Sequence, residues 1–301
     1  MTTPKSLNLD LPRSQILRGD CIEVIKRLPD ASVDAVVTDP PYGYLKHKLD
    51  ADFDEDALFS EFDRVLKPNG AIVMFGRGVP FFRRCLKLDA LGFLFKESVC
   101  WDKAIQSSPA HALHRIHEDA VIFGRKGFSV RKRYVPYVES RLADCDALKI
   151  KRDVDRLSAA LKHPENIKEA LDFIAGASLR FRCNAGRKHI TLQAGFVGAD
   201  RGLEVIREMR DGFVEKDLIR VPRDAHAEHG TQKPVRLMER LVAIVSDEGD
   251  VVLDPFAGSG STVVACAQTG RVGIGIEVVP EYAEIAERRL KEAQEKGACR
   301  G

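Results

Sequence analysis

Apolar residues in the first 124 positions occur in short runs that alternate with longer helical faces. Runs of the kind that form buried strands lie at residues 14–18, 33–38, 71–75, 94–101 and 120–123. Between them, apolar side chains recur at helical spacing after residue 21 and over residues 58–66, and Lys67-Pro68-Asn69-Gly70 closes the second of these patterns. Strands that alternate with helices predict an α/β fold with a doubly wound, mostly parallel sheet.

The pattern changes between residues 125 and 225, where the chain is basic and its apolar spacing favours helices without strand–helix alternation. The alternation then returns with a helix over residues 235–245, a strand at 251–254, a helix from Ser261, a strand at 272–276 and a helix from Pro280. We therefore predict that residues 1–124 and 226–301 are two halves of one α/β domain. Residues 125–225 would form a largely helical insert between them.

Charge is distributed unevenly along the chain, although the net charge is only +2. Between Arg125 and Arg223 there are 22 Lys and Arg residues against 14 Asp and Glu, whereas the rest of the chain carries 25 basic and 31 acidic residues. A basic segment inside an acidic frame is typical of an insert that binds a polyanion. A solvated helical surface explains the same composition equally well.

The seven cysteines and the hydropathy argue against several classes of protein. No two cysteines form a C-x-x-C pair, which disfavours zinc and iron–sulfur sites and indicates reduced thiols. His111, His114 and His117 recur at helical spacing, but we interpret them as a loop or a surface helix turn and predict no metal. The first residues lack the apolar run of a signal peptide and no stretch approaches about 18 apolar residues, so we expect a cytoplasmic protein without a membrane span.

Asp39-Pro40-Pro41-Tyr42 ends the second strand-like run and is the strongest local motif. Ligands of an open α/β sheet lie beyond the carboxyl ends of its strands. The prolines make a stiff turn that presents carbonyl acceptors, while Asp39 adds a carboxylate and Tyr42 adds a flat ring. Together these groups suit a flat heterocycle that carries an NH₂ group. A proline-rich turn in which Asp39 caps the next helix is the alternative.

Residues 251–262, VVLDPFAGSGST, combine a strand that ends in Asp with a glycine-rich turn and a helix start. Backbone N–H groups in such a turn can approach a nucleotide or nucleoside closely. Glu277 ends the next strand, where an acidic residue can hold ribose hydroxyls. The turn lacks the Gly-Lys-Ser/Thr of a P-loop and has Val263 in place of the third glycine of a dinucleotide site. An adenosyl ligand without a pyrophosphate therefore fits better than NAD.

In the order of these motifs the chain resembles the beta group of DNA amino-methyltransferases. That group has the DPPY half first, then the recognition segment, and the cofactor half last, as in Asp39–Tyr42, the basic insert, HGTQKP at residues 229–234 and DPFAGSGST. The resemblance covers residues 14–44, looser patches to about residue 127 and nearly all of residues 229–290. It implies the sheet of an S-adenosylmethionine-dependent methyltransferase. Residues 1–124 would be its catalytic half, 125–225 its target-recognition insert and 226–301 its cofactor-binding half.

The resemblance assigns roles to residues by position. Asp20 would hold the adenine amino group of the cofactor and Glu277 its ribose, although helix capping or an ion pair also explains either residue. Residues 231–233 would grip the methionine end, and Cys21 also fits a small core residue. Ser261 stands where the family commonly has threonine, but a hydroxyl remains. The predicted cofactor-binding residues are Asp20, Cys21, Thr231, Gln232, Lys233, Asp254, Phe256, Gly258, Ser259, Gly260, Ser261, Thr262 and Glu277.

The implied catalytic residues are Asp39, Pro40, Pro41 and Tyr42, and the expected cofactor is S-adenosylmethionine, released as S-adenosylhomocysteine, with no metal. The reaction needs an amino lone pair in line with the methyl–sulfur bond. Hydrogen bonds from the target NH₂ to Asp39 and to the Pro40 carbonyl would stabilise positive charge on the nitrogen. The base must leave the duplex, and stacking on Tyr42 would offset about 1–3 kcal/mol of that cost.

The predicted activity is methylation of adenine N6 in DNA, and N4 methylation of cytosine is the nearest alternative. Within the family an initial Asp usually accompanies adenine and an initial Ser accompanies cytosine. Methylation of cytosine carbon 5 is disfavoured because the sequence has no Pro-Cys pair. Enzymes that methylate RNA or a protein glutamine usually have Asn in place of Asp39.

Two functions from other classes also stay open. A nucleotide-binding dehydrogenase explains the glycine-rich turn but leaves DPPY and TQKP unexplained, and a non-catalytic DNA-binding regulator does not need intact motifs. The expected partners are double-stranded DNA and, because relatives often dimerise, a second copy of the chain. Arg131, Lys132 and Arg133 are the candidate phosphate contacts.

Overall fold

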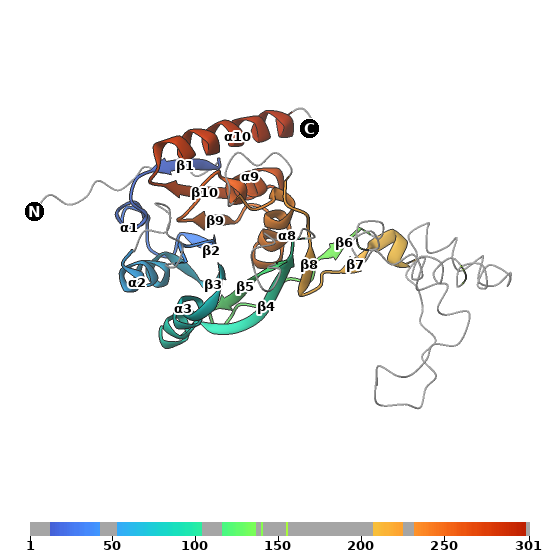
Figure 1. Cartoon of the computed structure of the whole chain (residues 1–301), viewed down its shortest axis with the longest axis horizontal. Helices are drawn as coiled ribbons and strands as arrows, with labels where there is room; N and C mark the ends of the chain where they lie inside the picture. The colour runs from blue at the N-terminus through green and yellow to red at the C-terminus, as the bar shows by residue number, and fades with distance from the viewer. Residues whose placement is uncertain are drawn as a thin grey trace, which may run out of the picture. The chain divides into compact units, whose positions relative to one another are not determined.

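The short apolar runs of both halves of the chain join in one eight-stranded sheet (Figure 1). Every described strand pair in it is parallel except the two that β5 makes with β3 and β4. Along the sheet the strands are β1 (Gln15–Arg18), β10 (Val272–Glu277), β9 (Val251–Asp254), β2 (Val33–Thr38), β3 (Leu66–Gly76), β5 (His117–Gly124), β4 (Leu94–Asp102) and β8 (Leu218–Arg220).

The chain divides into two compact units, one of residues 1–132 and 216–301 and one of residues 133–215. The computed structural model describes residues 13–42, 53–103, 116–136, 140, 155, 207–224 and 232–298. The first unit contains the eight-stranded sheet. The described part of the second includes the antiparallel pair β6 (Tyr134–Val135) and β7 (Phe213–Val214) and a helical turn over residues 207–211.

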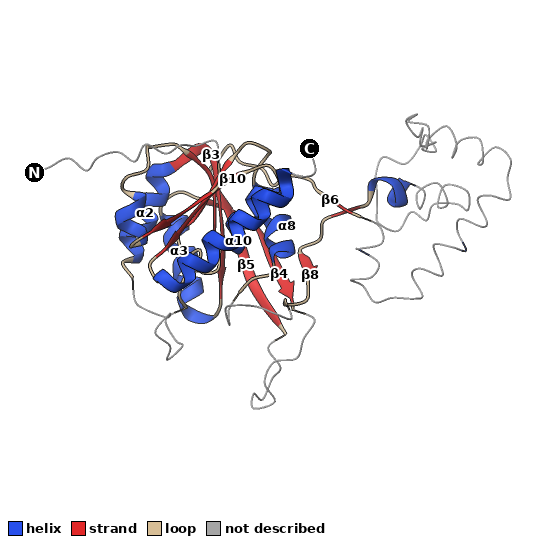
Figure 2. Cartoon of the chain, turned by 90° about the horizontal axis from the view of Figure 1, so that it is seen from above, coloured by secondary structure: helices blue, strands red, loops and turns tan. Residues whose placement is uncertain are grey.

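The central strands are apolar on both faces because helices cover both faces of the sheet (Figure 2). Consecutive residues show this directly: Val36 packs in one core and Val37 in the other, as do Ile72 and Val73. One face carries α1 (Cys21–Ile25), α2 (Glu55–Val65) and α3 (Gly78–Ala90), and the other carries α8 (Val235–Val245) and α9 (Ser261–Gln268), with α10 (Pro280–Ala298) against β1, β10 and α9.

This architecture confirms the predicted doubly wound, mostly parallel α/β sheet. The apolar spacing did not predict α3, because the apolar side chains of this helix do not form one stripe. Phe81 and Leu88 face the core, whereas Phe82 and Leu86 are exposed on the helix surface. The predicted turn at residues 67–70 is instead the beginning of β3, which follows α2 without a break.

The second unit is shorter than the predicted insert of residues 125–225. Residues 125–132 and 216–224 belong to the unit that contains the sheet, and β8 extends the sheet by pairing with β4. The helical character predicted for the insert falls mostly outside the described residues and stays a prediction. Within the described part of the chain, no helix has the length and apolar character needed to cross a membrane.

Two glycines in β10 allow α9 to approach the sheet closely. A Cβ atom on Gly275 would lie 2.7 Å from Val263 Cγ2 and 2.8 Å from Ile16 Cδ1, and one on Gly273 would lie 3.0 Å from the Cα atom of Val263. Val263 is the residue that stands where a dinucleotide-binding helix has its third glycine. The close approach of helix and strand is thus preserved, with the small residues on the strand instead of the helix. It holds the start of α9 near the carboxyl ends of the strands.

We predict that Gly275→Ala lowers the free energy of unfolding by about 1–3 kcal/mol, because the added methyl group overpacks the contact with Val263. Urea unfolding followed by circular dichroism measures this change. The control repeats the substitution in a Val263→Ala background, where the cost should shrink because the nearest methyl group is gone. Equal costs in both backgrounds would contradict the proposed contact.

Candidate active site

The carboxyl ends of four adjacent parallel strands place four acidic residues in a row. Following the order of the strands in the sheet, Asp20 comes after β1, Glu277 ends β10, Asp254 ends β9 and Asp39 comes after β2. The helix after β2 packs on one face of the sheet and the helix after β9 packs on the other, so the two turns diverge. Open α/β sheets bind ligands at such a switch point. The two strongest sequence motifs therefore meet at one edge of the sheet.

The glycine-rich turn between β9 and α9 has two glycines with left-handed backbone, and they serve different purposes. Gly258 and Gly260 have φ angles of 51° and 78°. A Cβ atom on Gly260 would lie 2.8 Å from Cβ of Ala286, whereas one on Gly258 would meet nothing within 4 Å. Gly260 therefore permits packing against α10, and Gly258 leaves its backbone open toward a ligand. Ser259 lies between them. Nη1 of Arg289 donates to the carbonyl oxygen of Ser259 at 2.5 Å and to its Oγ at 2.9 Å.

Glu277 and Asp20 are each held by backbone N–H groups. Gly258 N–H donates to Oε2 of Glu277 and Val279 N–H donates to Oε1, both at 2.8 Å. Asp20 caps α1, where its Oδ1 accepts from the N–H groups of Ile22 at 3.0 Å and Glu23 at 3.1 Å. The capping role weighed for Asp20 is therefore present, whereas Glu277 binds N–H groups of two turns and not of a helix. The roles predicted for them in binding ribose and adenine stay predictions, and carboxylate oxygens can accept more than one hydrogen bond.

Asp254 is buried beneath the glycine-rich turn and holds its first residues. Its Oδ1 accepts from Phe256 N–H at 3.1 Å, and its Oδ2 accepts from the Thr262 hydroxyl at 2.5 Å. Burial raises the pKa of Asp254 to about 7, and the nearby carboxylates of Asp39 and Glu277 add to this effect. The hydrogen bonds of Asp254 to Phe256 and Thr262 thus connect the beginning of the turn to the beginning of α9. Phe256 packs against Phe53, which precedes α2, with ring centroids 5.1 Å apart.

Asp39 is held by two groups of the chain itself. The Tyr42 hydroxyl donates to Oδ1 at 2.8 Å, and the buried ammonium of Lys233 donates to Oδ2. The family resemblance implies cofactor binding for Lys233 and base stacking for Tyr42, and neither role indicates that both side chains bind Asp39. Nζ of Lys233 also lies 4.9 Å from the ring centroid of Phe75, so the ion pair sits against an aromatic surface.

A second carboxylate, Glu118 of β5, lies on the other side of the same ammonium. Its Oε2 is 3.1 Å from Lys233 Nζ, and its Oε1 accepts from Lys103 Nζ at 3.1 Å and from Arg223 Nη2 at 3.2 Å. Although burial by itself raises the pKa of Glu118, the ammonium groups of Lys233 and Lys103 lower it to about 2. Asp39 and Glu118 in turn raise the pKa of Lys233, against the effect of its burial.

Glu118 is not among the residues predicted from the sequence, although its place in the alternating pattern of β5 marks it as a buried charge. Glu118, Ala120 and Ile122 alternate along β5 and share a buried face, so a charged residue stands at a core position. Buried carboxylates are rare unless they are paired, and that pattern marks a candidate for a functional site. The partners that compensate it come from distant segments and could not be identified from spacing.

Gln232, which directly precedes Lys233, offers an acceptor that fits a ligand with N–H donors. Oε1 of Gln232 is buried and has no hydrogen-bond partner among the described residues, while its Nε2 donates to Asp224 at 3.1 Å. This orphaned acceptor and the open space at Gly258 suit the amino and adenosyl groups of the expected cofactor. Thr231 lies outside the described residues. Cys21 is buried in the core with its pKa raised to about 11 by burial, as the alternative of a small core residue requires.

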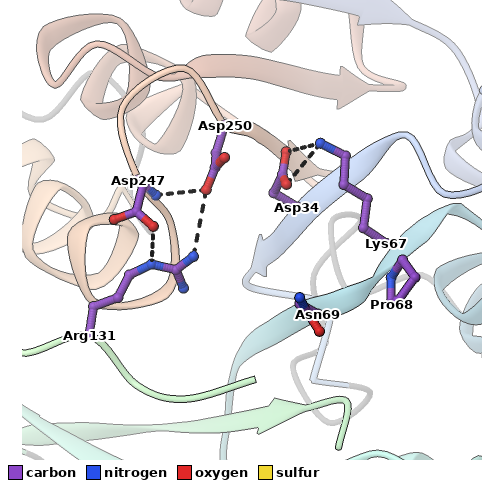
Figure 3. Close-up of a pocket in the computed structure, with 7 residues that line it drawn as sticks. All are labelled: Asp34, Lys67, Pro68, Asn69, Arg131, Asp247 and Asp250. Atoms are coloured by element: carbon purple, nitrogen blue, oxygen red, sulfur yellow. Dashed lines mark hydrogen bonds and ion pairs between the residues drawn. The ribbon is translucent and has the colours of Figure 1, made fainter. Parts of the chain in front are cut away.

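Arg131 lies at the opposite edge of the sheet, beside a cavity of about 320 Å³ (Figure 3). The cavity is lined by residues near the amino ends of β2, β3 and β9, and its charges are paired within the chain. Arg131 binds Asp247 at 2.7 Å and the Val245 carbonyl at 2.7 Å, and Lys67 binds Asp34 at 2.7 Å. We therefore do not assign the reaction to this cavity. Contact of Arg131, Lys132 and Arg133 with DNA stays a prediction.

One group of side chains could hold a metal ion, but it does not face Asp39. The donor atoms of Cys100, His117 and Asp119 lie within 4.8 Å of one another. Asp119 directly follows Glu118 on β5, so the group lies on the other face of the sheet. His111 and His114 lie outside the described residues.

Known proteins with similar sequences cover nearly the whole chain. The sequence model of the DNA methylase family (N6_N4_Mtase) matches residues 33–288. The Type II methyltransferase M.HpaI of Haemophilus parainfluenzae is 28% identical over 92% of this chain and 74% of its own length. The DNA adenine methyltransferase YhdJ of Escherichia coli K12 is 26% identical over 94% of this chain and 84% of its own length.

Solved structures share the fold at lower identity. The M1.HpyAVI–SAM complex has a TM-score of 0.53 at 22% identity, covering 91% of this chain and 98% of that one. The PvuII DNA methyltransferase, named as cytosine-N4-specific, has a TM-score of 0.54 at 16% identity, covering 94% of this chain and 92% of its own.

The raised pKa of Asp254 predicts a specific dependence of stability on pH. Between about pH 4 and pH 7 the folded protein keeps a proton that the unfolded chain releases, so the free energy of unfolding falls as the pH rises through this window. Asp254→Asn keeps the shape of the protonated group and removes this dependence. The difference in unfolding free energy between variant and wild type should therefore shift in favour of the variant from pH 4 to pH 7. A difference that stays constant across these pH values would contradict the buried, protonated state.

Proposed function

Because the chain belongs to the DNA methylase family, we propose that it transfers a methyl group from S-adenosylmethionine to the N6 amino group of a flipped-out adenine in double-stranded DNA. The family match confirms the resemblance drawn from the sequence and the prediction of an enzyme that methylates DNA. The observation that supports methyl transfer to an amino group is the position of the Asp39 carboxylate. It follows β2, which pairs with β9, and the turn after β9 contains Gly258.

The row of acidic residues supports a cofactor that lies across the ends of β1, β10 and β9. Asp20 would accept from its adenine amino group, Glu277 from its ribose hydroxyls, and Oε1 of Gln232 from its α-amino group. When bound there, S-adenosylmethionine would supply an electrophilic sulfonium methyl group. The turn after β9 then lies between this site and Asp39, so the substrate amine and the cofactor would approach each other across it.

The chain's own residues would orient the amine and stabilise its developing charge. Asp39 and the carbonyl of buried Pro40 would each accept a hydrogen bond from the NH₂ group, which turns the nitrogen lone pair away from the ring. Tyr42 would provide a surface for the flipped base, and its hydroxyl orients Asp39. Lys233 binds the other carboxylate oxygen of Asp39 and so helps to hold this side chain in place.

Two observations favour adenine over cytosine. The tetrapeptide begins with Asp39, which usually accompanies adenine in this family. The relative YhdJ, which matches 94% of this chain, is named a DNA adenine methyltransferase. The PvuII relative is named for cytosine N4, so the fold itself serves both bases. The expected homodimer stays a prediction.

We predict that Asp39→Ala lowers methyl transfer to DNA by at least about 100-fold, because the NH₂ group loses its charged acceptor. Methyl incorporation from labelled S-adenosylmethionine measures the rate, and mass spectrometry of the digested nucleosides identifies N6-methyladenine or N4-methylcytosine. Calorimetry should show that cofactor binding is retained, because the predicted contacts of Asp20, Glu277 and Gly258 do not involve Asp39. Wild-type turnover in this variant would refute the role of Asp39, and N4-methylcytosine as the product would refute the choice of base.

The basic segment predicts a steep dependence of DNA affinity on salt. Each neutralised phosphate contributes about −0.9 to the slope of log affinity against log salt concentration. Lys132→Ala and Arg133→Ala should each reduce this slope by about 1, whereas Lys291→Ala on the exposed surface of α10 should not. Fluorescence anisotropy with a labelled duplex measures the slope, and a flat response of the wild type would remove phosphate contacts from the proposal.

A further inference from the structure

We propose that Glu118 is a positioning residue that takes over the ammonium of Lys233 when Asp39 binds the amino group of the target base. The proposal rests on the assigned role of Asp39. It assigns two states to one buried cation: ion-paired with both carboxylates but hydrogen-bonded to Asp39 in the free enzyme, and hydrogen-bonded to Glu118 once the base has entered.

The need for such an exchange follows from the contacts of Asp39. Both of its carboxylate oxygens already accept hydrogen bonds within the chain, Oδ1 from the Tyr42 hydroxyl and Oδ2 from Lys233. The side chain of Asp39 is only 25% exposed, so little space remains around these oxygens. Each oxygen can accept a second hydrogen bond, but in this confined space a substrate amine that binds Oδ2 must share it with the ammonium of Lys233 and weakens that contact.

The second state is prepared in the structure. Oε2 of Glu118 is buried and accepts no hydrogen bond from the described residues, yet it lies 3.1 Å from Nζ of Lys233. The other oxygen of Glu118 is held by Lys103 and Arg223, so the side chain is anchored with Oε2 directed at the ammonium. This buried oxygen is already ion-paired with the ammonium, and a reorientation of the NH₃⁺ group is enough to form a well-directed hydrogen bond.

Electrostatics explains why a second carboxylate is needed. The side chain of Lys233 is 9% exposed and its ammonium lies 4.9 Å from Phe75 and 5.9 Å from Trp101, measured to the ring centroids. A buried cation that loses its counter-ion is strongly disfavoured. Because Glu118 also pairs with Lys233, the contact between Asp39 and the ammonium can weaken without leaving the buried charge unpaired. Among the described residues, the charged groups that face Glu118 are Lys103, Arg223 and Lys233, and the carboxylate on the far side of Lys233 is Asp39.

The test is Glu118→Gln, measured for kcat, KM and their pH profiles. In this variant Asp39 is the one counter-ion that the ammonium keeps among the described residues, so kcat at neutral pH should fall about 100-fold while cofactor affinity stays unchanged. Raising the pH should partly restore kcat. Without the Glu118 carboxylate, which raises the pKa of Lys233, this lysine loses its proton more readily and then releases Asp39. The wild type should show no such rise. Asp119→Asn, the neighbouring carboxylate on the other face of β5, is the matched control and should keep wild-type kinetics.

Each result decides a different question. Wild-type kcat and pH profile in Glu118→Gln, or a loss that no pH restores, would overturn the proposal, because the second outcome indicates a purely structural role. If Glu118→Gln does not fold, Glu118→Asp takes its place, since it keeps the charge but withdraws it from Nζ. The same partial loss with recovery at high pH is expected, and its absence would overturn the proposal. Failure of the wild type itself to methylate DNA would instead refute the proposed function.

Discussion

Four carboxylates stand in a row because four parallel strands end at the same edge of the sheet, and charges of one sign that are partly buried must each be compensated. Asp20 and Glu277 are compensated by backbone N–H groups. Asp254 is compensated by keeping a proton, because burial raises its pKa to about 7. Asp39 is compensated by the side-chain ammonium of Lys233. The geometry of the whole candidate site depends on these three kinds of compensation.

The kind of compensation separates the two halves of the site. Backbone N–H groups hold Asp20 and Glu277, and the hydrogen bonds from Phe256 and Thr262 hold Asp254, so the cofactor side of the row is held in one arrangement. A side-chain ammonium can change partners, and this is the compensation found at Asp39, where a substrate would enter. Each part of the site combines residues from both sides of the insert: Asp20 lies in the row with Asp254 and Glu277, and Lys233 binds Asp39.

The extension of the sheet beyond β3 contributes to the site as well as to the fold. Lys103 follows β4, Glu118 lies on β5 and Arg223 follows β8, and all three belong to one charge cluster. Trp101 of β4 connects these segments, because its Nε1 donates to the Val221 carbonyl at 2.8 Å. The antiparallel strand β5 brings Glu118 to the buried face behind Asp39, a position that the parallel strands alone do not supply.

The sequence by itself determined the α/β fold class, the position of most strands and the two motifs at the strand ends, because strand periodicity, Asp39–Tyr42 and the turn at Gly258 are local features. It did not reveal α3, whose apolar residues lie on two faces, or β8, which is short and depends on pairing with β4. Only the tertiary structure decided that Lys233 binds Asp39, 194 positions away in sequence, and that Glu118 lies on the other side of the ammonium. Charge compensation in a core is a property of distance in space, and spacing along the chain does not encode which buried charges meet.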